Sequence, residues 1–165
     1  MKIIITENQL KFINEALGVP DNILDAAEML YDIVERDIKS IDSVEEEYEF
    51  DGEIELELGD KHKVMIDSYE LKVKIEEIED QEGVLDIISM GMSGGFGFNR
   101  DVYMKETEPS TTLELTITFA VGENWEPEGL IRKMEEERDE HVASLAHELK
   151  HKYDKQSKKF GLIGP

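Results

Sequence analysis

The sequence predicts an α+β fold, because segments with helical periodicity flank a central region with the alternation of strands. Apolar residues recur at helical spacing over residues 21–39 and 127–156, and a shorter helix is expected over 7–17. The segments with a strand pattern are 48–58, 64–78, 84–90 and 111–121. We therefore expect two N-terminal helices, an antiparallel or mixed sheet of about four or five strands, and one long C-terminal helix.

The predicted N-terminal helices have recognisable ends. Thr6 and Gln9 have the spacing of a capping box at the start of the first helix, which Gly18 and Pro20 close. The apolar residues of the second segment keep helical spacing, and this helix should run to about Lys39.

The predicted strands have one solvent-facing side. Over residues 69–76, Tyr, Leu, Val and Ile alternate with Glu and Lys, which favours a sheet that is covered on one face only. Asp51 and Gly52 indicate an irregularity or a turn in the first strand. A glycine-rich connection over 91–110 joins the last two strands, and its GMSGGFGF run lacks the Lys and Ser/Thr of a phosphate-binding loop. We interpret it as a hairpin loop or flap.

The C-terminal helix is the clearest predicted element. Pro127 stands where a first-turn proline belongs, and apolar residues from Leu130 to Tyr153 recur mostly three or four positions apart. Trp125, just before this helix, is expected in the core or where the helix begins.

The acidic composition of the chain argues against negatively charged partners. The chain has 165 residues, the size of one ordinary domain, with 40 Asp and Glu against 18 Lys and Arg and a formal net charge of -22. A surface this acidic repels phosphate backbones and anionic lipid, so we expect neither nucleic acid nor a membrane surface as a partner.

The lack of cysteine and the N-terminal sequence bear on the possible metal ligands and on the cellular location. The chain has no cysteine, which removes disulfides and thiolate zinc sites, so a metal would have to bind to His, Asp or Glu. The apolar run from Ile3 to Ile5 is too short for a signal peptide or a transmembrane segment. We expect a cytoplasmic protein, or one packaged in a virus particle.

Residues 147–151 read HELKH, the pattern His-Glu-x-x-His, within the predicted C-terminal helix. Two histidines four residues apart lie on one face of a helix, so His147 and His151 can both reach a single Zn²⁺, with Glu148 beside them. Zinc lowers the pKa of a bound water to about 7, and a carboxylate within reach can pass its proton to the leaving amine of a peptide. The spacing predicts zinc ligands at His147 and His151 and a general base at Glu148.

A helical wheel separates this motif from the core. One side carries Val142, Leu145, Ala146, Leu149 and Tyr153. The other side carries Glu140, Ser144, His147, Glu148, His151 and Asp154. The motif should therefore face a sheet edge or a cleft, unless the two histidines are simply exposed helix residues.

The motif and its surroundings resemble the zincin metallopeptidases, in which His-Glu-x-x-His lies on an active-site helix behind a small mixed sheet. The resemblance covers residues 111–153 and implies that the strand 111–121 is the sheet edge along which a substrate peptide lies extended. The segment VGENWEPEGLI, residues 121–131, is similar to the Gly-x-Met-Glu-Asn-Trp segment of gluzincin aminopeptidases, although the methionine is absent. The acidic composition and the KIIITENQ start look like those of phage-encoded proteins.

The third zinc ligand of these families has no clear counterpart. Metzincins carry it six residues after the second histidine, where this chain has Ser157, and gluzincins carry a glutamate on a later helix. The candidates within the chain are Asp154, Glu140, His62 and His141. We expect that residues 1–165 form a single zincin-like domain lacking a C-terminal portion that carries the third ligand, or that a partner chain supplies it.

Two functions follow from this sequence. The first is a zinc metallopeptidase that acts on a peptide or protein substrate. The second is a non-catalytic structural or interaction protein, for example a phage particle component, in which HELKH is vestigial or accidental. Metal content distinguishes the two.

Overall fold

A computed structural model describes residues 19, 21–58, 63–94, 97–99 and 112–159. The elements are α2 (Asp21–Lys39), β1 (Glu47–Leu58), β2 (Lys63–Glu82), β3 (Val84–Gly94), β4 (Gly97–Asn99), β5 (Thr112–Glu123), α3 (Pro127–Glu136) and α4 (Arg138–Lys159). The predicted α+β class is confirmed. The helix expected over 7–17 and most of the glycine-rich connection lie outside the described residues. No helix in the described part of the chain is long and apolar enough to cross a membrane.

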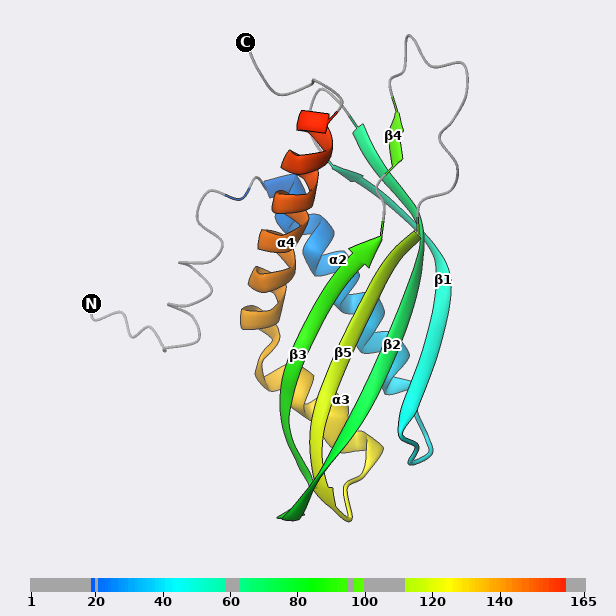
Figure 1. Cartoon of the computed structure of the whole chain (residues 1–165), viewed down its shortest axis with the longest axis vertical. Helices are drawn as coiled ribbons and strands as arrows, with labels where there is room; N and C mark the ends of the chain where they lie inside the picture. Colours follow the sequence, from blue (N-terminus) through cyan, green and yellow to red (C-terminus); the bar gives the residue numbers. More distant parts are fainter. Residues whose placement is uncertain (1–18, 20, 59–62, 95–96, 100–111, 160–165) are drawn as a thin grey trace, which may run out of the picture.

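The sheet is mixed, as one of the two expected arrangements. Its strand order is β1-β2-β5-β3, and the short β4 pairs with the beginning of β2 (Figure 1). The pairs β1–β2 and β3–β5 are antiparallel, whereas β2 and β5 run parallel. Gly83 connects β2 directly to β3, yet β5 lies between these two strands.

The implied position of the strand 111–121 at a sheet edge is wrong. This strand, β5, lies in the interior of the sheet, and β3 forms the edge beyond it. The reason is its apolar content. The buried residues of this strand are Leu113, Leu115, Ile117, Phe119 and Val121. A position between two neighbouring strands removes more of this apolar surface from water than an edge position would.

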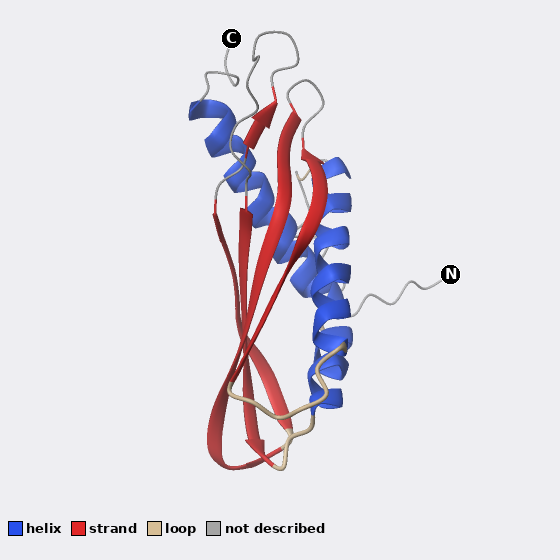
Figure 2. Ribbon diagram, turned by 90° about the vertical axis from the view of Figure 1, so that its right-hand side faces the viewer, coloured by secondary structure: helices blue, strands red, loops and turns tan. Residues whose placement is uncertain are grey.

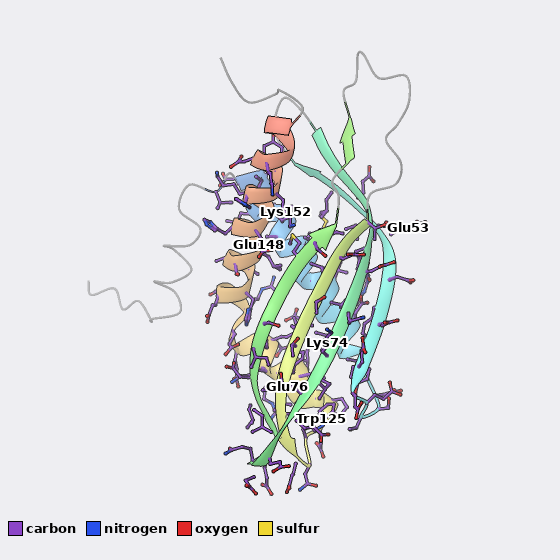
Figure 3. The ribbon with its side chains drawn as sticks, in the orientation of Figure 1. Glu53, Lys74, Glu76, Trp125, Glu148 and Lys152 are labelled. Carbon is purple, nitrogen blue, oxygen red and sulfur yellow. The ribbon has the colours of Figure 1, made fainter. Side chains whose placement is uncertain are left out.

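The three described helices all cover one face of the sheet (Figure 2). Helix α2 contacts α3, α4 and β1, while α3 and α4 also contact β3. The core lies between these two layers. The residues that α2 contributes are Ile23, Ala26, Ala27, Leu30, Tyr31, Val34 and Ile38. Polar side chains line the opposite face, including the exposed Lys74 and Glu76 of β2 (Figure 3).

The first strand does not turn at Asp51 and Gly52, as the sequence suggested it could. It continues through both residues, and its register with β2 shifts between Glu53 and Leu56. Gly52 lies against the ring of Tyr69, where an added Cβ would be 2.7 Å from a ring carbon. The glycine therefore makes room for a buried tyrosine. The Tyr69 hydroxyl donates to Asp37 Oδ2 at 2.6 Å and thereby ties the end of α2 to the sheet.

The expected single C-terminal helix is wrong in one respect, because it is broken at Glu137. This residue has φ -111° and ψ 18° and separates α3 from α4. In a continuous helix, the Met134 carbonyl would accept from the amide of residue 138. Here it accepts instead from the Glu137 amide at 3.2 Å and from the Tyr31 hydroxyl at 2.6 Å. A side chain from α2 thus takes the place of a backbone bond and favours the break.

Candidate metal-binding helix

All three residues of the His-Glu-x-x-His motif lie within α4. The four-residue step from His147 to His151 corresponds to a rise of about 6 Å along the helix and to nearly the same face. The predicted helical placement of the motif is confirmed, and the four-residue spacing puts the two histidines on nearly the same side of α4.

The predicted separation of the two helix faces is also confirmed. Val142, Leu145, Ala146 and Leu149 are buried against the core. His147 and His151 are exposed. Glu148, which Figure 3 labels on α4, is half-buried. The imidazoles therefore contribute little to packing and are accessible to a ligand from solvent.

Arg138 and Tyr31, which the sequence did not single out, connect the start of α4 to α2. The Arg138 guanidinium lies 2.8 Å from Asp32 Oδ1 and 3.5 Å from Glu35 Oε2, both on α2. It also lies 5.0 Å from the centre of the Tyr31 ring. Burial, and then the negative charge of Glu35, raises the pKa of Tyr31 well above its usual range, so its hydroxyl remains a donor to the Met134 carbonyl even at a pH where an exposed tyrosine is ionised. These contacts set the position from which α4 carries the motif.

Two of the candidate third ligands have partners four residues away in the sequence. Asp154 Oδ2 lies 2.7 Å from Lys150 Nζ, so it would have to leave an ion pair to bind a metal. His141 Nε2 lies 3.0 Å from Glu137 Oε2, one turn earlier. His141 precedes His147 by six residues, about 9 Å along the axis, which is too far for a shared metal ion.

Of the two remaining candidates, only Glu140 lies within the described residues. Glu140 precedes His147 by seven residues, about 10 Å along the helix. His62 lies outside the described residues. Within the described ranges, no group of three or more His, Cys, Asp and Glu side chains is placed to hold a metal ion. The described residues thus offer two candidate ligands, His147 and His151, one fewer than a catalytic zinc site requires from protein.

The motif does not open into any of three hollows in the described part of the molecule. One is lined by residues 40–50, one lies on the polar sheet face, and one is formed around Trp125. None of these three includes a residue of α4. These hollows therefore do not support the expectation that the motif faces a cleft. Helix α4 does contact the edge strand β3.

Comparison with known proteins gives no match. No family model and no curated protein match the sequence, and no solved structure matches the fold.

Proposed function

We propose that this protein is a zinc-dependent metallopeptidase, in which His147 and His151 hold the metal and Glu148 is the general base. The observation that carries the proposal is the division of α4: the fold buries one face, and the exposed face presents both histidines one turn apart. Packing does not explain two imidazoles and a carboxylate at this spacing, whereas metal binding does.

In the proposed hydrolysis, zinc would activate the water and Glu148 would transfer the proton. When bound, zinc lowers the pKa of water to about 7 and polarises a carbonyl oxygen. Glu148 follows His147 directly on α4 and is half-buried, which places it beside the two histidines. It accepts a proton from the attacking water and donates it to the leaving amine, a role worth about 10²- to 10⁴-fold in rate.

The third ligand in this proposal comes from outside the described residues. His62, a segment beyond the motif, or a partner chain would each have to reach the exposed face of α4. Approach from another element is also what a tetrahedral site requires, because a third residue of the same helix turn cannot complete it.

The substrate would pair with β3 rather than with β5. Helix α4 contacts β3, and β3 is an edge of the sheet in the described part of the chain. Edge strands offer unpaired backbone groups, to which an extended peptide can add as another strand.

A second candidate is the non-catalytic structural or interaction protein. It is favoured by one observation, the lack of a third metal-ligating side chain near His147 and His151 among the described residues. In that case HELKH is an exposed helix surface, and the chain acts through its contacts.

The two candidates differ in zinc binding and in hydrolysis by the purified full-length chain. By calorimetry, we expect wild type and Glu148→Gln to bind one zinc ion and His147→Ala to bind none. Wild type should hydrolyse a fluorogenic peptide library. Glu148→Gln should bind zinc without hydrolysing the peptides. Asp139→Asn, an exposed acid at the start of α4, is the matched control and should behave as wild type. Wild type that binds no zinc and cleaves nothing would favour the second candidate.

A further inference from the structure

A second candidate site lies at the end of the sheet that is remote from the motif. Figure 3 shows Trp125 near one end of the molecule and Glu148 toward the other. Three segments meet around Trp125: the loop after α2, the end of β2, and the turn after β5. They enclose a hollow of about 520 Å³, lined by Val44, Glu77, Ile78, Glu79, Gly122, Glu123, Asn124 and Trp125.

Three of the side chains that line this hollow are large and apolar: Val44, Ile78 and Trp125. Large hydrophobic side chains are exposed at four described positions, Met29, Val44, Ile78 and Ile88. Two of these four, Val44 at 58% exposure and Ile78 at 44%, line the same hollow although they are far apart in sequence. Trp125, which is almost fully buried, adds an aromatic wall. Grouped exposed apolar side chains of this kind mark interaction surfaces.

The rim of the hollow is negatively charged. Glu77, Glu79 and Glu123 line it and are exposed, and none of the described residues lining it is Lys or Arg. Carboxylates around an apolar hollow attract a cationic group that flanks an apolar one. They also repel a second copy of a chain whose net charge is -22.

Backbone hydrogen bonds hold the hollow open in advance. The Gly122 amide donates to the Gly83 carbonyl at 2.8 Å, and the Gly83 amide donates to the Glu123 carbonyl at 3.1 Å. A Cβ on Gly122 would lie 2.3 Å from the Gln81 backbone, so only glycine allows this close approach. On the opposite wall, the Tyr48 hydroxyl accepts from the Glu45 amide at 2.8 Å, next to Val44. A preformed wall lowers the ordering cost of binding.

We propose that this hollow binds a segment of a partner protein in which one large apolar side chain is flanked by Lys or Arg. The apolar side chain enters beside Ile78 and Trp125, and the cations pair with the carboxylates of the rim. The site is small, which predicts weak and transient binding that depends on salt. This inference does not depend on the zinc site or on peptidase activity.

Trp125 makes the test specific, because it is the only tryptophan in the chain. The probe is a capped Gly-Lys-Leu-Lys-Gly peptide, titrated into the full-length protein while tryptophan emission is recorded. We expect a saturable change that weakens as NaCl is raised. The charge-reversed peptide Gly-Glu-Leu-Glu-Gly should give no saturable change at the same concentrations.

Variants assign the response to the hollow. Ile78→Ser should weaken binding about tenfold, as expected for loss of a buried aliphatic contact. The double variant Glu77→Gln, Glu79→Gln should remove most of the salt dependence. The matched controls Ile88→Ser and Glu55→Gln change an equally exposed aliphatic residue and an exposed acid on other strands, and should leave the response unchanged.

Any one of three results would overturn the proposal. The first is equal binding of the two peptides, and the second is binding by Ile78→Ser as tight as that of wild type. The third is a dimer, seen by sedimentation, that Ile78→Ser abolishes. The last result would identify the occupant as a second copy of this chain instead of a basic partner.

Discussion

The two faces of α4 differ in burial: one packs in the core and the other is exposed to solvent. On one face, Leu145, Ala146 and Leu149 are buried, and their shapes are set by the core. On the other, His147 and His151 are exposed, and no packing contact requires their imidazoles. The difference teaches where to look for function: residues that the core does not need, at a spacing that suits a metal ion, are the ones that stability cannot explain.

The largest expected effect comes from the buried face. Leu149→Ala should lower the free energy of unfolding by about 2–5 kcal/mol, because it removes a fully buried side chain and leaves a cavity. His147→Ala should change it by no more than about 0.5 kcal/mol, as is usual at an exposed position. Urea denaturation of both variants measures the contrast. Equal destabilisation by the two would mean that the histidine face is also structural.

A smaller effect is expected at the break between α3 and α4. Tyr31→Phe removes the hydrogen bond to the Met134 carbonyl and should cost about 1 kcal/mol, since that carbonyl keeps the Glu137 amide as a donor. The circular dichroism of the variant should remain that of an α+β protein. An unchanged midpoint of unfolding would show that the Tyr31 bond does not hold the two helices in place.

The same tyrosine predicts a dependence on alkaline pH. Burial raises the pKa of Tyr31, and also those of Tyr48 and Tyr69, above the ordinary value of 10.0. Above that value the unfolded chain loses tyrosine protons that the folded chain keeps, so deprotonation favours unfolding. The contribution of these groups to stability is complete below about pH 10 and is lost as the pH rises further.

Unfolding followed between pH 8 and pH 11 measures this dependence. Tyr31→Phe should be less stable than wild type at pH 8 and should lose stability less steeply above pH 10. A parallel decline in both proteins would contradict the assignment to Tyr31.

The smallest effect is expected at the surface contacts of Arg138. Asp32→Asn should cost between about 0 and 1 kcal/mol, because Asp32 is largely exposed and its ion pair with Arg138 is screened. The cost should shrink when the denaturation is repeated in 1 M NaCl. A salt-independent loss would indicate that Asp32 acts through packing instead of charge.

Local patterns in the sequence predicted the parts of the fold that depend on local interactions. Helix α2 begins at Asp21, where Asp21 or Asn22 was expected as its cap, and ends at Lys39 as predicted. The exposed and buried faces of α4 agree with the helical wheel. Both follow from periodicity alone. The break at Glu137 could not be predicted in this way, since it depends on Tyr31, which is 103 residues from Met134 in sequence.

The position of β5 shows the same limit at the level of the sheet. Its alternation identified it as a strand, but its neighbours β2 and β3 are chosen by long-range pairing that no local pattern records. Its run of buried apolar residues was the available signal for an interior position. The hollow around Trp125 was missed because Val44, Ile78 and Trp125 come from three separate segments.

The candidate site was predicted only as far as one helix defines it. His147, Glu148 and His151 lie on α4 as expected, because their relation depends on helix geometry. A third ligand must come from another element, and its identity depends on tertiary placement that spacing within α4 does not determine.

Zinc K-edge absorption of the full-length chain tests the central claim most directly. With one equivalent of zinc, we predict two imidazole nitrogens at about 2.0–2.1 Å from the metal. The same spectrum is expected for Glu148→Gln, whereas His147→Ala, which no longer holds the metal, should show no imidazole scattering. A wild-type spectrum without imidazole scattering, or one that His147→Ala leaves unchanged, would contradict the assignment of α4 as the metal-binding helix.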